Sequence, residues 1–264
     1  MCTRKSPTSF ARSADRVIIT KSPAELEIMR EAGRITAAAL DAVAEAVRPG
    51  VTTAELDAVA EGVIVRAGAR PAFKGYHGFP ATLCTSVNDQ VVHGIPGSRV
   101  LREGQIVSVD CGAIVEGYYG DSARTFAVGT VSTQAQRLMD VTRRSLEAGI
   151  ARCVPGMRLY DISAAVQEVA EAAGFSVVRE YVGHGIGRAM HEDPQIPNYG
   201  KAGTGPTLKA GMVLAIEPMI NAGGADVRSL EDGWTVVTLD GAMSAHFEHT
   251  VAVADKGPRI LTVV

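Results

Sequence analysis

The sequence predicts an α+β domain built from two related halves, each with two helices followed by strands. Three observations support this prediction: a sequence pattern recurs after 106 positions, capping sequences open helices in both copies, and β-branched, apolar runs follow the helices. The halves span residues 22–130 and 131–264, after a basic tail of residues 1–21. Because no linker rich in Pro, Gly and Ser separates them, we expect one domain, residues 22–264.

The repeat consists of matched residues that follow the same order in both halves. At an offset of 106 positions, the matches are Pro49-Gly50, Leu56 and Gly68 with Pro155-Gly156, Ile162 and Gly174. At an offset of 107, they are His77-Gly78 with His184-Gly185, and Leu101, Gly104, Val107 and Asp110 with Leu208, Gly211, Leu214 and Glu217. An internal duplication explains this order, and similar helix-turn chemistry in unrelated segments is the alternative.

The helices are predicted from their starts and stops. Ser22 and Glu25 form a capping box around Pro23, so a helix begins there and ends at Pro49-Gly50. The other predicted helices are one that opens with Thr52 and Glu55 and ends near Gly68, one that opens with Thr133 and Gln136 and ends at Pro155-Gly156, and one that ends at Gly174.

Apolar, β-branched runs predict the strands. In the first half, Ile106–Ala113 and Asp121–Val128 flank the turn residues Glu116-Gly117, which predicts a hairpin. The strands expected in the second half are Met212–Ile216, Trp234–Leu239 and Phe247–Val253.

Four carboxylates lie within these apolar strands. Asp110 and Glu217 hold equivalent positions in the repeat, and Asp121 and Glu248 lie on the neighbouring strands. We expect Asp110 and Asp121 to face each other across the hairpin to within one residue of register. Four buried anions need a compensating charge, and a pair of divalent cations fits better than the single strand arginine, Arg124. The alternative is that Asp121 or Glu248 faces solvent.

One histidine is the candidate imidazole ligand for these cations. His184 lies within Gly183-His184-Gly185-Ile186-Gly187, where small residues allow a close approach of the backbone. A histidine in a surface loop is the alternative interpretation.

Composition excludes several function classes. The chain has 264 residues, 26 Lys and Arg against 29 Asp and Glu, and a net charge of −3, which argues against nucleic-acid binding by bulk positive charge. The basic tail lacks the apolar core of a secretory signal, and no apolar run approaches the length of a membrane span. The scattered cysteines, Cys2, Cys84, Cys111 and Cys153, are typical of reduced thiols in a cytoplasmic protein.

Several motifs together resemble the type I methionine aminopeptidases. They are Gly75-Tyr76-His77-Gly78-Phe79-Pro80, Asn88-Asp89-Gln90-Val91-Val92-His93-Gly94-Ile95-Pro96, Val109-Asp110-Cys111-Gly112, the glycine-rich segment around His184, Ile216-Glu217-Pro218 and Phe247-Glu248-His249-Thr250-Val251. They occur in family order and cover about residues 22–260. The resemblance implies the pita-bread fold and removal of N-terminal methionine from nascent proteins and peptides, with a small second residue preferred.

The resemblance also implies a ligand set and catalytic residues. Five side chains would hold two divalent cations, and these are Asp110, Asp121, His184, Glu217 and Glu248, with Asp121 and Glu248 bridging. Co²⁺, Mn²⁺, Fe²⁺ and Zn²⁺ all suit such a donor set. Glu217 would carry the proton from the attacking water to the leaving amine. His191 would stabilise the oxyanion, and His93 would hydrogen-bond the substrate backbone.

A pocket for the methionine side chain follows from the same resemblance. Its lining would be Phe73, Tyr76, Phe79, Cys84, Met190 and Trp234, with His93 and His191 at the scissile bond. Aromatic and sulfur contacts suit a thioether, although such residues are also common in plain cores. Phe73 stands where many bacterial relatives have cysteine, and Met190 stands where an aromatic residue is usual.

Two other functions remain open at this point. One is a prolidase or Xaa-Pro aminopeptidase of the same fold, although the large N-terminal domain of those enzymes is missing. The other is a non-catalytic binding protein that kept the fold. For an aminopeptidase, the expected partners are Met-peptides and nascent chains, with no nucleic acid or membrane, and the expected state is a monomer. A transient ribosome contact by the basic tail is an alternative to a disordered tail.

Overall fold

The computed structural model describes residues 17–264, which contain two helix pairs and a set of short and long strands. The helices are α1 (Pro23–Ala46), α2 (Thr53–Arg66), α3 (Thr133–Ile150) and α4 (Leu159–Ala172), with a 3₁₀ turn, η1 (Tyr76–Gly78). The strands of the first half are β1 (Arg70–Pro71), β2 (Leu83–Val87), β3 (Gln90–Val92), β4 (Ile106–Val115) and β5 (Tyr118–Ala127).

The second half contributes more and shorter strands. They are β6 (Ser176–Val177), β7 (Gly183–Gly185), β8 (Glu192–Ile196), β9 (Val213–Ile216), β10 (Met219–Asn221), β11 (Val227–Ser229), β12 (Val236–Thr238), β13 (Ser244–His246), β14 (His249–Ala254) and β15 (Gly257–Ile260). Two expectations are corrected here. The run 234–239 is a strand only over β12, and the run 247–253 is a strand only from His249, because the chain leaves the ladder at Phe247-Glu248.

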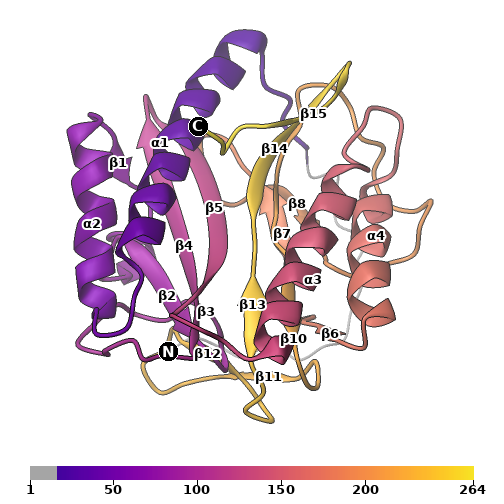
Figure 1. Ribbon diagram of the computed structural model, residues 1–264. Coiled ribbons are helices and arrows are strands. Elements are labelled where there is room, and N and C mark those ends of the chain that lie inside the picture. The colour runs from indigo at the N-terminus through magenta and orange to yellow at the C-terminus, as the bar shows by residue number, and fades with distance from the viewer. Residues whose placement is uncertain (1–16) are drawn as a thin grey trace.

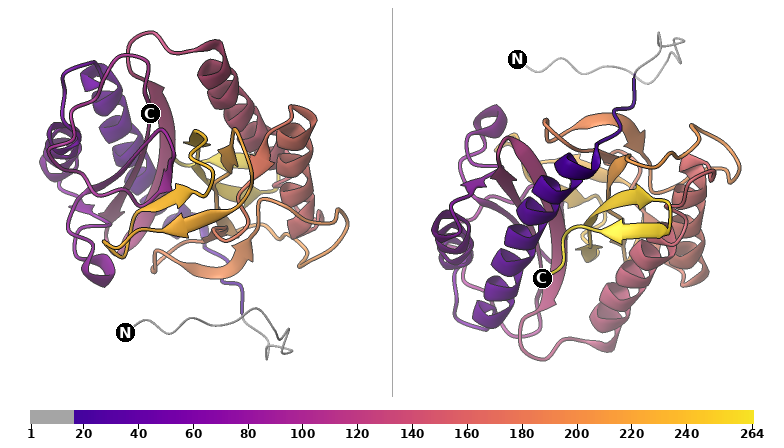
Figure 2. Two further views of the ribbon diagram at one scale, coloured as in Figure 1. Left: turned by 90° about the horizontal axis from the view of Figure 1, so that it is seen from below. Right: turned by 90° about the horizontal axis from the view of Figure 1, so that it is seen from above.

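The helices lie on the outside and the strands lie between them. Figure 1 shows α1 and α2 on one side of the strands and α3 and α4 on the other, and the views of Figure 2 agree. In the first half β4 pairs with β1, β2 and β5, and in the second the strand order is β15-β14-β9-β7-β8. Two three-stranded sheets, β13-β10-β6 and β11-β12-β3, complete the layer. This arrangement of two αα-plus-strand halves confirms the predicted fold class.

The strands of the two halves show which matched residues of the sequence repeat occupy equivalent positions in the fold. Each half has a central strand, β4 or β9, between a preceding strand, β2 or β7, and a following strand, β5 or β14. Asp110 on β4 and Glu217 at the end of β9 therefore correspond. The proposed match of His77 with His184 is wrong, because His77 lies in η1 before β2 whereas His184 lies on β7.

Side-chain hydroxyls join the two halves along a seam between β5 and β13–β14. Thr250 Oγ1 donates to the carbonyl of Asp121 at 2.7 Å, and Ser122 Oγ donates to the carbonyl of Glu248 at 2.7 Å. The Glu248 N–H donates to the carbonyl of Ala123 at 2.9 Å. These contacts place Asp121 and Glu248, one from each half, next to each other at the centre of the molecule.

Local capping explains where the helices begin. Both partners of the predicted capping box are present at α1, where the Ser22 N–H donates to Glu25 Oε2 at 2.8 Å. For α3 the predicted cap is wrong by one residue, because Ser132 is the N-cap and accepts from the Ala135 N–H at 3.1 Å. A side-chain oxygen satisfies one of the free N–H groups of the first turn in both cases.

The described chain begins at residue 17, within the segment 1–21 that we expected to be the tail. Lys21 is 7% exposed, and its N–H donates to the carbonyl of Gly211 in the second half at 2.7 Å. Figure 2 shows this segment leading into α1. The rest of the predicted tail, residues 1–16, lies outside the described residues.

Each helix pair covers its own apolar core. One core contains residues of α1, α2, β2 and β4, and another contains residues of α3, α4, β9 and β14. Close approach of α1 to β5 depends on glycine, since a Cβ on Gly120 would lie 2.6 Å from the nitrogen of Gly33. No helix in the described chain is long and apolar enough to cross a membrane.

Candidate active site

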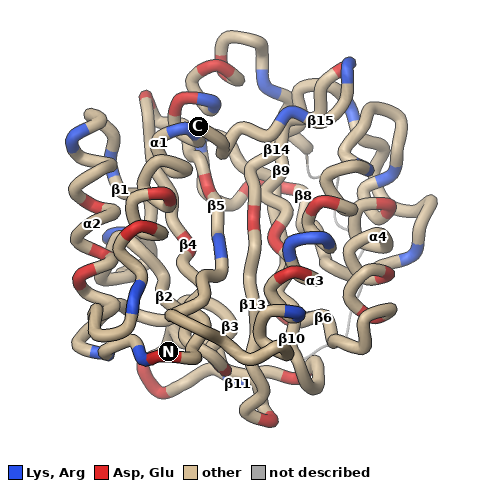
Figure 3. Tube along the Cα trace, in the orientation of Figure 1, with Lys and Arg blue, Asp and Glu red and all other residues tan. Residues whose placement is uncertain are grey.

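The five predicted metal ligands lie together at the centre of the molecule. Asp110 comes from β4, Asp121 from β5, His184 from β7, Glu217 from the end of β9, and Glu248 from the break between β13 and β14. One ligand atom each from Asp121, His184 and Glu248 all lie within 4.8 Å of one another. His184 Nε2 lies 3.5 Å from Glu217 Oε1 and 3.9 Å from Asp121 Oδ2. Figure 3 shows acidic positions on these central strands as well as on the outer helices.

Asp110 and Asp121 lie diagonally across the hairpin. Gly112 is opposite Asp121 and Ala123 is opposite Asp110, so the two acids are two residues out of register. The expected offset of at most one residue is wrong. An offset of two keeps both side chains on the same face, because side chains alternate with a period of two.

Burial and mutual repulsion dominate the electrostatics of the acids. Burial raises the pKa of Asp121 to about 7. Burial, followed by the charges of Asp121 and Glu217, raises the pKa of Asp110 well above its usual range. The same two kinds of cause raise the pKa of Glu217 and of Glu248. Without a positive charge the four acids resist ionisation together.

The nearest strand arginine does not supply that charge. Arg124 lies on β5, but its guanidinium pairs with Asp41 on α1 at 2.5 Å. Asp110 Oδ1, Asp121 Oδ1 and Glu248 Oε1 are buried and have no hydrogen-bond partner within the described chain. Unpartnered buried carboxylate oxygens that face one another fit the coordination of divalent cations.

His184 is held in the state that a metal ligand needs. Its Nδ1 lies 2.9 Å from the carbonyl of Gly185, which can only accept, so Nδ1 carries the hydrogen and the lone pair is on Nε2. Burial lowers the pKa of His184 to about 3, so the imidazole is neutral. The glycines around it serve close packing, since a Cβ on Gly183 would lie 2.4 Å from the carbonyl oxygen of Ala215.

A cavity of about 480 Å³ opens onto the ligand cluster. All the side chains expected to bind substrate line it, together with the five ligands. The lining residues are Phe73, Tyr76, His77, Phe79, Cys84, His93, Asp110, Asp121, His184, Met190, His191, Glu217, Trp234 and Glu248. The apolar members form one cluster, in which the rings of Phe79 and Trp234 meet edge to face at 5.1 Å.

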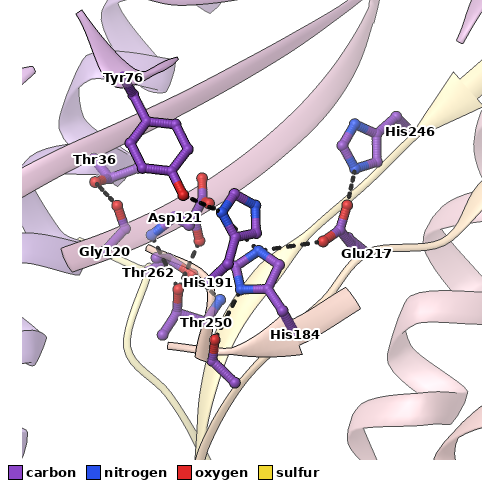
Figure 4. Close-up of polar contacts among 11 residues, drawn as sticks. Thr36, Tyr76, Gly120, Asp121, His184, His191, Glu217, His246, Thr250 and Thr262 are labelled. Carbon is purple, nitrogen blue, oxygen red and sulfur yellow. Dashed lines mark hydrogen bonds and ion pairs between the residues drawn. The ribbon is translucent and has the colours of Figure 1, made fainter. Parts of the chain in front are cut away.

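Two histidines stand between the ligand cluster and the apolar part of the cavity. His191 Nδ1 lies 2.8 Å from the hydroxyl of Tyr76, and its ring lies 4.3 Å from the ring of His184 (Figure 4). Burial lowers the pKa of His191, and it lowers the pKa of His93 to about 4. Both imidazoles are therefore neutral near pH 7 and can donate one hydrogen bond each.

The sequence reasoning did not select two further histidines. His77 lines the cavity beside Tyr76, and its place in the quoted segment 75–80 was an available signal. His246 is buried on β13, with Nε2 3.7 Å from Glu217 Oε2 (Figure 4). Its position two residues before Glu248 was the only signal for it, because alternate residues of a strand share a face.

A buried group of carboxylates with a neutral imidazole, beside a substrate-sized cavity, defines a metal-dependent hydrolase. The sequence model of metallopeptidase family M24 matches residues 27–255. The chain belongs to this family.

Individual proteins show which enzymes of this family the chain is similar to. Methionine aminopeptidase 1 of Bacillus subtilis is 55% identical over 248 residues, covering 94% of this chain and all of the relative. Methionine aminopeptidase of Escherichia coli K12 is 45% identical over 248 residues, covering 93% of this chain and 94% of the relative. The crystal structure of methionine aminopeptidase from Thermotoga maritima matches with a TM-score of 0.93 and 48% identity, covering 94% of this chain and 100% of that one.

More distant enzymes share the architecture. Prolidase from Pyrococcus furiosus matches with a TM-score of 0.75 and 24% identity, over 94% of this chain and 66% of the prolidase. At that identity the likeness shows only the fold. These neighbours have the pita-bread fold in common, as the sequence motifs implied.

Proposed function

We propose that the chain hydrolyses the first peptide bond of polypeptides that begin with methionine, using two divalent cations held by its five central ligands. It is a metal-dependent aminopeptidase of the M24 family, and its high-identity relatives support removal of N-terminal methionine. The observation that carries the proposal is that the ligand cluster and an apolar cluster of side chains line the same cavity. A methionine side chain in the cavity would bring its own peptide bond to the ligands.

The ligand set suits two cations that share carboxylates. Asp121 and Glu248 lie at the seam between the halves and would be shared by both cations. Asp110, His184 and Glu217 would each be a ligand of one cation. When bound, the cations would supply a water that ionises near neutral pH and would polarise the scissile carbonyl. Co²⁺, Mn²⁺, Fe²⁺ and Zn²⁺ all fit oxygen ligands with one imidazole.

Glu217 is the proposed proton carrier. It lies at the end of β9, facing His184 on one side and His246 on the other. A carboxylate at this position would take a proton from the attacking water and give it to the leaving amine.

His191 and His93 are the proposed contacts to the scissile peptide. In this proposal the Tyr76 hydroxyl is the donor of its 2.8 Å hydrogen bond with His191 Nδ1, which leaves the imidazole hydrogen on Nε2, where it would stabilise the oxyanion. Burial raises the pKa of Tyr76, which keeps this hydroxyl protonated. His93 follows β3 in a left-handed conformation (φ 59°) and lines the cavity, so its neutral imidazole would hydrogen-bond the substrate backbone.

The apolar cavity is the proposed methionine pocket. Phe73, Phe79, Cys84, Met190 and Trp234 surround it with rings and sulfur, which contact a thioether favourably. Phe73 and Met190 are the positions where the family pattern differs, so they are the residues most able to alter side-chain preference.

The remaining proposals concern the cellular setting. We place the protein in the cytoplasm as a monomer that acts on nascent chains with a small second residue. The buried free thiols of Cys84, Cys111 and Cys153 support a reducing compartment. A transient ribosome contact through the basic residues of segment 1–16 is also proposed.

Peptide selectivity tests the function. The Mn²⁺-loaded protein should release methionine from Met-Ala-Ser at least about a hundredfold faster, in kcat/KM, than alanine from Ala-Ala-Ser, because the shorter side chain leaves the pocket unfilled. A Met190→Ala variant should lose part of this preference. Cleavage of an Xaa-Pro dipeptide in preference to Met-Ala-Ser would instead indicate a prolidase.

A further inference from the structure

A buried ion pair lies just outside the cavity and joins the segment before α1 to the second half. Lys21 Nζ lies 2.6 Å from Glu192 Oε2, and the two side chains are 4% and 10% exposed. Lys21 is held at both ends, because its N–H donates to the carbonyl of Gly211 at 2.7 Å and Nζ donates to the carbonyl of Ile19 at 3.2 Å. A pair this buried holds one geometry more firmly than an exposed pair does.

The second oxygen of the Glu192 carboxylate closes a turn. Glu192 Oε1 accepts from the N–H of Arg188 at 2.8 Å and from the N–H of Ala189 at 3.3 Å. The residues between these amides and Glu192 are Met190 and His191, and both line the cavity. The carboxylate therefore fixes the backbone of the turn that carries two site residues.

The absence of a side chain at Gly187 leaves the space that this ion pair occupies. A Cβ on Gly187 would lie 2.5 Å from Glu192 Oε1 and 2.5 Å from Lys21 Cε, so only glycine leaves room for both side chains. The Gly187 carbonyl accepts from the N–H of Tyr119 at 2.9 Å. The last glycine of the segment around His184 thus makes space for the ion pair and links the turn to the first half.

We propose that Lys21 is a positioning residue for catalysis, acting through Glu192 to hold the turn that places His191 at the scissile bond. The inference rests on the proposed role of His191. Among the described residues, the Lys21 ammonium has polar contacts with the Ile19 carbonyl and the Glu192 carboxylate, so its effect passes through the Glu192 carboxylate and the two amides. In the proposed reaction His191 stabilises the negative charge that develops on the substrate oxygen. A small displacement of its imidazole would therefore slow catalysis strongly.

Four variants test the proposal in the Mn²⁺-loaded protein: Lys21→Met, Lys21→Arg, the double variant Lys21→Met with Glu192→Gln, and the control Arg259→Met. The control breaks an exposed ion pair, Arg259 with Glu27 at 2.8 Å. The measurements are kcat and KM for Met-Ala-Ser, the Mn²⁺ dissociation constant, the melting temperature, and amide hydrogen exchange of the peptide that contains residues 188–192.

Lys21→Met should lower kcat about tenfold to a hundredfold and speed exchange of the Arg188 and Ala189 amides, with the Mn²⁺ affinity unchanged. Lys21→Arg should recover most of kcat, and Arg259→Met should behave like the wild type. The double variant leaves no unpaired buried charge, so it should fold even if Lys21→Met does not. Its glutamine keeps an acceptor for the two amides but loses the ion pair that fixes it, so its kcat should remain below that of the wild type.

Two results would overturn the proposal. One is wild-type kcat in the folded double variant, and the other is a loss of kcat that only follows loss of Mn²⁺ binding and melting temperature. His191→Ala is measured in parallel. Full activity of that variant would refute the role of His191 itself, and the exchange data would then decide separately whether Lys21 orders the turn.

Discussion

The hydroxyl of Tyr76 lies 2.8 Å from Nδ1 of His191, a hydrogen bond that joins the two halves of the molecule across the cavity. Tyr76 belongs to η1 of the first half, and His191 immediately precedes β8 of the second. With Tyr76 as the donor, as proposed, the hydrogen of His191 lies on Nε2. In the proposed function, this pair of side chains would serve both the methionine pocket and the oxyanion.

Removing that hydroxyl should slow the reaction more than it weakens binding. In Tyr76→Phe the ring still fills the cavity, but His191 is free to move its hydrogen to Nδ1. We expect kcat for Met-Ala-Ser to fall about fivefold, the effect of one hydrogen bond of roughly 1 kcal/mol, with KM changed less than threefold. Steady-state kinetics and the ¹⁵N shifts of the His191 ring measure both effects. Tyr160→Phe, outside the cavity lining, is the matched control, and an unchanged kcat in Tyr76→Phe would refute this role.

Glu248→Gln should stabilise the metal-free protein while abolishing its response to metal. Burial and the charges of Asp121, Glu217 and Asp110 disfavour the ionised Glu248 carboxylate, so a neutral amide relieves repulsion at pH 7.5. We expect the melting temperature of the chelator-treated variant to rise by about 3 °C or more, and added Mn²⁺ to raise it no further. Glu147→Gln, at an exposed site on α3, should match the wild type in both measurements. A less stable metal-free Glu248→Gln variant would show that the acids do not repel one another as described.

The stability of the metal-free protein should fall as the pH rises from 6.5 to 8. The pKa of Asp121 is about 7 in the folded protein against an ordinary 3.8, so folding retains a proton that the unfolded chain releases, and stability declines with rising pH. The pKa values of His93, His184, His246 and His249, about 4, 3, 3 and 4, are lower than the ordinary 6.5, so their opposing contribution rises with pH up to about 7.5. The raised pKa values of Asp110, Glu217 and Glu248 add to the decline caused by Asp121, and above about pH 7.5 the carboxylates act alone.

Melting curves at pH 6.5 and 8.0 measure this dependence. The metal-free protein should melt about 3 °C or more lower at pH 8.0, whereas saturating Mn²⁺ should remove the difference, because cations take the place of the retained protons. Equal melting temperatures without metal would mean that the four acids are not held close together in solution.

Local signals in the sequence were sufficient for much of the fold. The capping box of Ser22 and Glu25 and the turn Glu116-Gly117 involve neighbouring residues, and both occur as predicted. The register of the hairpin was also within reach: a two-residue turn pairs Val115 with Tyr118, and counting back places Gly112 opposite Asp121. The error came from estimating the register from the spacing of Asp110 and Asp121 without counting back from the turn.

Other features depend on contacts that no local pattern records. The carboxylates could be grouped because charge in an apolar strand is costly wherever it occurs. The hydroxyl seam could not be predicted, because Thr250 contacts Asp121 from 129 positions away in the sequence. Serine and threonine in a strand also have many ordinary explanations. Lys21 meets Glu192 from 171 positions away, and a lysine in a basic segment is usually solvated. The failed match of His77 with His184 shows that a repeated dipeptide alone does not establish equivalence.

Methionine release during metal titration tests the central claim most directly. Chelator-stripped protein would be titrated with Mn²⁺ or Co²⁺ while free methionine from Met-Ala-Ser and bound metal per chain are both measured. Release that is absent without metal, appears as cations bind and stops increasing at two cations per chain is the expected result. Release at full rate from protein with no bound metal, or no release from protein that has bound two cations, would contradict the assignment of the five central side chains as a catalytic metal centre.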